Sequence, residues 1–267
     1  MAEVLANKSI KSTDVFDDSF FESLIENTSR LIDEQTARFF YPRLQTRKHD
    51  LPMPYNPMLR LSADCVTINS VVNGDTTTVA SSNYFTYPYE DTPIWAIELK
   101  NSSQIIWMPD VNMNNQAAIS INGIWAYHTD AFHMWRPLTT LAAAIATTSV
   151  TTFTATNGAL FSSGQIIKID SEFMLVVSAS GSTVTVERAW NGTTAATHLI
   201  LANVYVWRTQ GEINRACRDI VMAVYNNRYG NAATGQITIT AAGVIVTPDD
   251  IPATTRLTLE QIARKGW

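Results

Sequence analysis

The 267-residue chain has few charged residues and only two cysteines. Charged residues make up 16% of the sequence, below the usual share of about 25%, so Thr, Ser and Asn must supply much of the polar surface. This composition suits β-rich proteins and proteins that bury surface in an assembly. Cys65 and Cys217 lie far apart in apolar surroundings, which favours buried, reduced thiols over a disulfide.

The sequence also lacks a long, uninterrupted apolar run. Residues 1–13 contain no apolar core of a signal peptide, and Leu138–Phe161 is rich in Ala but broken by many Thr residues. We therefore expect neither a secretory signal nor a membrane span. At roughly 150 residues per domain, the length suggests about two domains, or three small ones.

Positive charge is scarce in the middle of the chain. The segment Leu61–Trp207 holds four basic and ten acidic residues, a net of −6, within a total of −5. The segment Arg208–Trp267 holds seven basic and five acidic residues, a net of +2. The acidic middle argues against tight, phosphate-driven binding of nucleic acid, whereas the C-terminal part could meet an acidic partner.

Motifs of catalysis and of cofactor binding are missing. There is no P-loop, Gly-rich dinucleotide fingerprint, Gly-x-Ser-x-Gly elbow or Cys-x-x-Cys pair, so we predict no cofactor and no enzymatic activity. Asp170 and Glu172 could act as the acid and base of a glycosidase, but they flank a predicted turn, where solvated carboxylates are usual. The spacing of His128, Asp130 and His133 matches no strong metal-ligand motif.

Two amphipathic helices are predicted near the two ends of the chain. Apolar residues recur at three- and four-residue steps in Asp17–Phe40, with a capping-box pattern at Ser19 and Glu22 and a stop at Pro42. The second helix is Glu212–Tyr229. Neither helix can bury its apolar stripe alone, so we expect them to pack on each other. The packing residues are Phe21, Leu24, Ile25, Leu31, Ile213, Ile220 and Val224.

The middle of the chain reads as two β modules. The first has a hairpin turn at Asn73-Gly74 and a strand at Ile105–Met108 among others. The second runs from Pro137 to Trp207, and its ends should lie close in space. We therefore predict an α+β fold, a small α-helical core formed by the N- and C-terminal helices, with two inserted antiparallel β modules. The expected boundaries are 1–60 and 208–242 for the helical core, 61–136 and 137–207 for the β modules, and 243–267 for a docking tail.

The C-terminal segment is predicted to leave the subunit body and dock on a partner. Pro248 and Pro252 separate it from the preceding strand, and a short helix is expected at Leu257–Arg264. Its apolar and basic side chains would form the docking surface: Arg256, Leu257, Leu259, Ile262, Arg264, Lys265 and Trp267. Of the seven tryptophans, we expect most to fill the cores of the β modules, although they could instead line a carbohydrate site.

Three segments together resemble the head-to-tail connector (adaptor) proteins of long-tailed bacteriophages. They are Ala37–Arg43, which closes the first helix, Leu59–Tyr127, and Ile213–Gly230. The stretch Gly164–Met174 also looks like a small β module found in many phage structural proteins. The chain departs from the family at Ala126, where members often have Gly, and before the second helix, where they tend to have proline.

The resemblance implies a structural virion protein made in the host cytoplasm and placed in the neck between head and tail. It implies a ring of about twelve subunits between the portal and the stopper or tail proteins, with a C-terminal segment reaching the portal. Viral DNA would pass through the ring without specific binding, and no membrane is involved. Two alternatives stay open: a carbohydrate- or receptor-binding virion module, and a glycosidase using Asp170 and Glu172.

Overall fold

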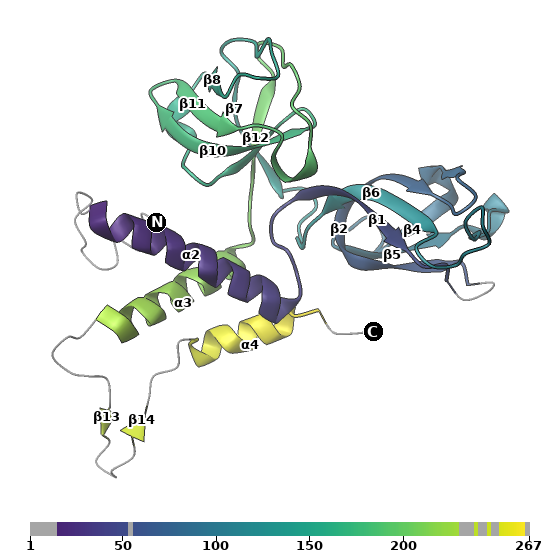
Figure 1. Ribbon diagram of the computed structural model, residues 1–267, viewed down its shortest axis with the longest axis horizontal. Coiled ribbons are helices and arrows are strands. Elements are labelled where there is room, and N and C mark those ends of the chain that lie inside the picture. The colour runs from purple at the N-terminus through teal and green to yellow at the C-terminus, as the bar shows by residue number, and fades with distance from the viewer. Residues whose placement is uncertain (1–14, 53–55, 230–237, 240–244, 247–250, 265–267) are drawn as a thin grey trace. The chain divides into compact units, whose positions relative to one another are not determined.

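The computed structural model describes residues 15–52, 56–229, 238–239, 245–246 and 251–264 (Figure 1). The chain divides into two compact units. One unit combines Met1–Arg38 with Gln210–Trp267 and contains the helices, and the other is Phe39–Thr209 and contains two large β-sheets.

The fold is mostly β, so the predicted α+β class with a helical core is wrong. Two six-stranded antiparallel sheets dominate the described residues, beside the helices α2 (Val15–Thr36), α3 (Gly211–Tyr229) and α4 (Ala253–Ile262). The two sheets have their own clusters of 14 and 13 buried apolar residues. The helices also bury apolar residues among themselves, including Phe21, Ile220 and Val221. Each sheet therefore has its own hydrophobic core, and the sheets are not insertions into a helical core.

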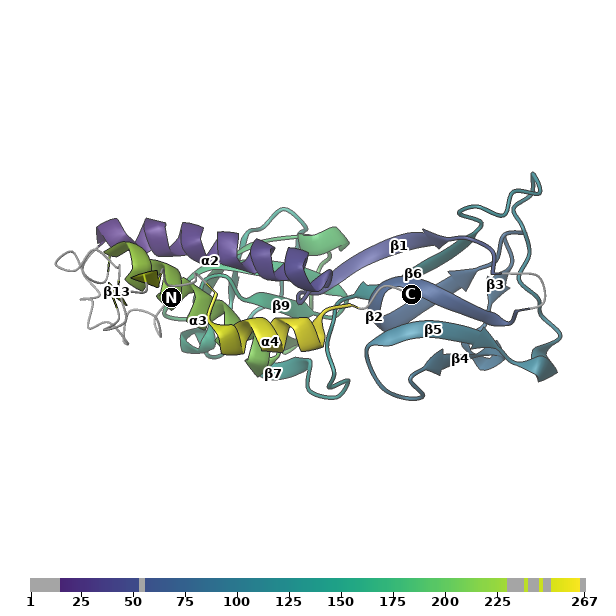
Figure 2. The ribbon, with the colours of Figure 1, turned by 90° about the horizontal axis from the view of Figure 1, so that it is seen from below.

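The helical unit is built from α2, α3 and α4, which lie side by side (Figure 2). The ring centroids of Phe21 on α2 and Tyr225 on α3 are 4.9 Å apart. Helix α2 begins before Ser19, so the capping-box start predicted there is wrong. None of the helices in the described ranges is long and apolar enough to cross a membrane. Two short strands, β13 (Thr238–Ile239) and β14 (Ile245–Val246), pair with each other.

Helix α2 ends four residues before the predicted Phe40. Ala37 has a left-handed φ of 51°. Its N–H donates to the carbonyl of Glu34, and the N–H of Arg38 donates to the carbonyl of Asp33. This nested pair of hydrogen bonds is a Schellman motif, and it stops the helix before Pro42 is reached.

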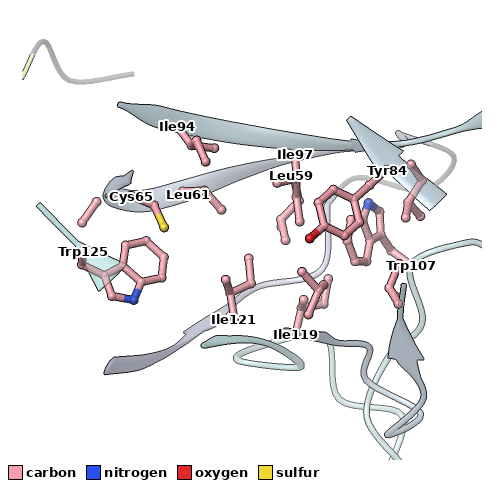
Figure 3. Close-up of a cluster of buried hydrophobic side chains, with 14 residues drawn as sticks. Leu59, Leu61, Cys65, Tyr84, Ile94, Ile97, Trp107, Ile119, Ile121 and Trp125 are labelled. Atoms are coloured by element: carbon pink, nitrogen blue, oxygen red, sulfur yellow. The ribbon is translucent and has the colours of Figure 1, made fainter. Parts of the chain in front are cut away.

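The first β module contains six strands in the order β1-β6-β2-β5-β4, with β3 beside β2. The apolar side chains of β2, β5 and β6 point toward one another in its core (Figure 3). Strand β1 pairs with β6 along its whole length, so the sheet starts earlier than the predicted boundary at residue 61. The strands are β1 (Arg43–His49), β2 (Met58–Val72), β3 (Thr78–Val79), β4 (Tyr84–Tyr87), β5 (Ile94–Leu99) and β6 (Ile119–Trp125).

The predicted hairpin turn at Asn73-Gly74 is confirmed, since it joins the paired strands β2 and β3. The buried Asn73 side chain donates to the carbonyl of Ile106 and accepts from the N–H of Met108, both at 2.9 Å. A Cβ on Gly74 would lie 2.2 Å from the carbonyl oxygen of Met108, so only glycine fits there. Ile105–Met108 is therefore an irregular segment held by the turn, and the strand predicted there is wrong.

The second β module has the strand order β7-β12-β9-β10-β11-β8. Its first and last strands pair, with Trp135 opposite Trp207, which confirms that the two ends of this module lie close in space. Its strands are β7 (Trp135–Thr140), β8 (Thr152–Thr154), β9 (Ile166–Ile169), β10 (Glu172–Ser180), β11 (Thr183–Glu187) and β12 (Asn203–Trp207). Short 3-10 turns interrupt the two modules at η1 (Ser81–Asn83), η2 (Asn101–Ser103), η3 (Gly158–Leu160) and η4 (Trp190–Gly192).

Candidate functional site

The residues predicted to join the two long helices differ in burial. Three of them are buried: Phe21, Ile213 and Ile220. The other four are half-buried: Leu24, Ile25, Leu31 and Val224. Val221, on the same apolar stripe of the second helix, is fully buried in the cluster that contains Phe21. These side chains build the helical unit.

The C-terminal helix lies against its own unit. Leu259 and Ile262 are buried, and α4 contacts both α2 and α3. The N–H of Arg264 donates to the carbonyl of Thr36 at 2.8 Å, and Arg38 Nε donates to the carbonyl of Ile262 at 2.6 Å. In this arrangement Leu259 and Ile262 cannot contact a partner.

The outward side of α4 keeps part of the predicted docking surface available. Leu257 is 59% exposed, and Arg256 is also exposed. Lys265 and Trp267 lie outside the described residues. The helix begins at Ala253, four residues earlier than predicted, because Pro252 takes the N-cap position. Docking through α4 would therefore use its exposed side.

A buried ion network lies at the start of β10. Glu172 is fully buried, so its prediction as a solvated turn residue is wrong. Arg188 donates from Nε and from a terminal nitrogen to the two carboxylate oxygens, each at 2.7 Å. The backbone N–H groups of Ala189 and Ala196 donate to the same carboxylate at 3.1 and 2.9 Å. Such a fully hydrogen-bonded buried pair holds distant chain segments in one fixed geometry.

His198 extends this network toward the surface. Its Nε2 lies 2.9 Å from a carboxylate oxygen of Glu172, and its Nδ1 lies 2.7 Å from Asp170. The His198 side chain is 1% exposed, whereas that of Asp170 is 64% exposed. The network therefore runs from the core of the second module to solvent.

The hydrogen bonds decide the chemistry available to Glu172. Burial disfavours its charge, but the Arg188 guanidinium, two backbone N–H groups and His198 outweigh burial and lower the pKa of the carboxyl to about 2. At neutral pH Glu172 is ionised, so it has no proton to donate as a general acid. The arrangement holds the adjoining backbone in shape. It is less suited to acid–base catalysis by Glu172 together with Asp170.

Directly after His198 the chain forms an exposed apolar turn, the Leu199–Leu201 turn. Leu199, Ile200 and Leu201 are 79%, 56% and 68% exposed. Leu201 has a φ of 65°, in the left-handed region that side chains other than glycine rarely adopt. This conformation costs about 1–2 kcal/mol for an L-residue, so the surrounding structure must hold it in place.

Backbone hydrogen bonds fix both ends of the Leu199–Leu201 turn. His198 and Ile145 exchange two hydrogen bonds of 2.9 Å on one side. On the other side, the N–H of Leu201 donates to the carbonyl of Leu141 at 3.0 Å. The turn is thus an apolar protrusion of defined shape, seated on buried, charged residues.

The first β module carries a pocket of about 640 Å³ near the Asn73-Gly74 turn. Its apolar lining comes from the irregular segment, from Leu99 at the end of β5 and from the chain around Leu51 and Pro57, and Lys100 also lines it. Ile106 is 67% exposed. The indole N–H of Trp107 donates to the carbonyl of Pro57 at 2.8 Å, which joins two parts of the lining. The sequence analysis identified neither this pocket nor the Leu199–Leu201 turn.

The histidines near Asp130 are engaged within the protein. His128 Nδ1 accepts from the N–H of Asp130 at 3.0 Å, so its Nε2 donates to the carbonyl of Arg208 at 2.8 Å. His133 lies 2.8 Å from the Asp130 carboxylate. Across the described ranges, no group of three or more His, Cys, Asp and Glu side chains is placed to hold a metal ion.

Three of the seven tryptophans are buried in the β modules, fewer than the majority expected from the sequence. Trp107, Trp125 and Trp207 are buried. Trp95 instead joins a surface group of rings on β4 and β5. Both cysteines are free; Cys65 is buried, and burial raises the pKa of its thiol to about 12.

Comparison of the chain with known protein families and with curated proteins finds no match.

Proposed function

We propose that this chain is the subunit of a head-to-tail connector in a tailed bacteriophage, a structural protein of the virion neck. Its copies would form a ring between the portal and the stopper or tail proteins, through which viral DNA passes without specific binding. The resemblance of Ala37–Arg43, Leu59–Tyr127 and Ile213–Gly230 to that family supports this proposal, as does the acidic balance of Leu61–Trp207.

The observation that carries the proposal is the Leu199–Leu201 turn. Three consecutive apolar side chains are more than half exposed, and one of them is held in a left-handed conformation. Exposed apolar groups of this kind mark interaction surfaces, and local strain clusters at functional sites. Both features are expected if this turn becomes buried when the protein joins an assembly.

The test is to image the purified full-length chain alone and after mixing with the portal protein of the same virus. We expect closed rings on the portal, whether or not rings form without it. Full-length protein that stays monomeric and unbound in the presence of portal rings would count against the connector assignment.

For the portal contact, we propose the exposed side of α4. Leu257→Asp should weaken binding to portal rings and leave the fold intact, because Leu257 is 59% exposed. A matched change on the same helix, Glu260→Gln, should leave binding unchanged. Equal binding by wild type and Leu257→Asp would place the portal contact elsewhere.

A carbohydrate- or receptor-binding virion module is the second candidate, and one feature favours it. Tyr87 at the end of β4 lies 4.7 Å from Tyr89, just after the strand, and 5.9 Å from Trp95 on β5, measured between ring centroids. The Tyr87 hydroxyl donates to Glu98. Aromatic rings beside a carboxylate can contact the apolar faces and hydroxyls of sugars. Binding of the full-length chain to a glycan array, abolished by Tyr89→Ala, would favour this candidate.

A further inference from the structure

We propose that the Leu199–Leu201 turn of one copy of this chain inserts into the pocket of the first β module of a neighbouring copy. The inference deepens the connector proposal and rests on it, because it names the partner of the exposed turn as a second copy of the same chain. The juxtaposed surfaces would be the turn before β12 and the pocket lined by Leu99, Ile105 and Ile106.

The shape of the turn suits insertion. Its side chains are exposed, yet its backbone is fixed by the hydrogen bonds to Leu141 and Ile145 and by the buried network beneath His198. A protrusion that already has its bound conformation loses little conformational entropy on binding. The left-handed Leu201 therefore acts as a preorganised part of the contact.

The pocket offers matching chemistry. Its volume of about 640 Å³ lies within the range of roughly 300–1,000 Å³ of sites that bury most of a small ligand. Aliphatic side chains line it together with the amides of Asn56, Asn101, Gln104 and Asn115. Ile106 is 67% exposed at its edge, although the buried Asn73 fixes the Ile106 backbone. Like the turn, the pocket offers exposed apolar side chains on a backbone fixed by hydrogen bonds, here those of Asn73 to Ile106 and Met108.

The charges beside the two surfaces are complementary. Lys100 lines the pocket, and the exposed carboxylate of Asp170 lies 2.7 Å from His198, the residue that precedes the turn. When Leu199 enters the pocket, Asp170 approaches Lys100 from the neighbouring copy. Opposite charges at the edge of an apolar contact favour the correct register.

Two different surfaces on one chain also meet the geometric requirement of a ring. In a closed ring each copy must offer one surface to the copy on one side and a different surface to the copy on the other side. The turn and the pocket are such a pair, whereas a self-complementary patch would give a twofold dimer.

Disulfide trapping between two full-length variants tests the pairing. Ile200→Cys places a thiol on the turn, and Ile106→Cys places one at the edge of the pocket; both replaced side chains are exposed. A disulfide forms only where the two Cβ atoms approach to about 4 Å. The variants are mixed at high concentration, oxidised gently, and the linked peptides are identified by mass spectrometry. The matched control pairs Ile106→Cys with Val177→Cys, which replaces a 44% exposed residue elsewhere on the second module.

We expect the mixture of Ile200→Cys and Ile106→Cys to yield several-fold more crosslinked dimer than the control mixture, and Lys100→Glu in the pocket variant to lower that yield. Equal yields in the two mixtures would overturn the pairing. Rings that form on the portal without this crosslink would leave the connector function standing and refute only the pairing. Crosslinking in a protein that forms no ring with the portal would support the pairing and refute the connector.

Discussion

Each β module presents an irregular apolar segment at its surface, but the two modules hold that segment by different chemistry. In the first module, the neutral side chain of Asn73 bonds to the backbone of Ile106 and Met108. In the second, the charged pair of Glu172 and Arg188 holds His198, the residue that precedes the Leu199–Leu201 turn. A neutral amide fixes a segment at little desolvation cost, whereas a buried ion pair fixes it only while both partners are present.

Removing one charge should therefore produce the largest difference between the modules. Glu172→Gln leaves Arg188 buried without its partner, so we expect a loss of about 3–5 kcal/mol in the free energy of unfolding of the second module. Amide hydrogen exchange should rise in β9, β10 and β12 and stay unchanged in the first module.

The neighbouring strand provides a matched control for this variant. Glu187→Gln removes an exposed carboxylate from β11 and should change stability by less than about 0.5 kcal/mol. If Glu172→Gln is as harmless as Glu187→Gln, the buried network does not hold the second module.

Acid should weaken the two modules in different pH ranges. Burial lowers the pKa of His49, in the first module, to about 4 from its ordinary 6.5. Below pH 6.5 the unfolded chain binds a proton that the folded module does not, so stability falls between pH 6.5 and 4, by on the order of 3 kcal/mol. The Glu172 contribution is present above pH 4.5 and is lost as the pH falls toward 2, because the folded pKa is about 2.

Hydrogen exchange measured from pH 7 to pH 3 separates these two effects. The first module should open before the second, and His49→Gln should reduce the response between pH 6.5 and 4. The buried His128, whose pKa is also lowered by burial, should supply the remainder. Simultaneous loosening of both modules in that interval would show that His49 is not the acid-sensitive group.

The smallest effect on stability is expected in the turn itself. Leu201→Gly removes the left-handed strain, so thermal unfolding should show unchanged stability or a gain of up to about 1 kcal/mol. The same variant should assemble less well, because it lacks an exposed apolar side chain and its turn is less rigid. A marked loss of stability would mean that Leu201 serves the fold and not the contact.

Local patterns in the sequence predicted local structure well. The Asn73-Gly74 hairpin is confirmed, because turn residues act over short distances. The closeness of the two ends of the second module follows instead from its expected place as an insertion, and the pairing of β7 with β12 confirms it. The end of α2 and the strand at Ile105–Met108 were mispredicted. In both cases a specific set of backbone or side-chain hydrogen bonds overrode the apolar pattern.

The candidate site depends on contacts that the linear sequence does not display. Arg188 and His198 lie 16 and 26 residues from Glu172, so the carboxylate looked like half of an exposed pair with Asp170. The run Leu199-Ile200-Leu201 could have been noticed as three apolar residues between a turn and a strand. Its exposure cannot be predicted from the sequence, because it depends on the second sheet forming its core without these three side chains. The predicted fold class was wrong for a similar reason. The apolar periodicity of a helix is visible in the sequence, whereas the size of the core that a sheet buries is not.

The most direct test of the account compares two full-length proteins, the wild type and the double variant Leu199→Ser/Ile200→Ser, for assembly on portal rings. Native mass spectrometry counts the subunits bound to each ring, and thermal unfolding verifies that the variant is folded. The account predicts a complete ring for the wild type and only scattered or absent subunits for the equally stable variant. A variant that fills the ring as the wild type does would contradict the claim that this exposed turn is an assembly surface.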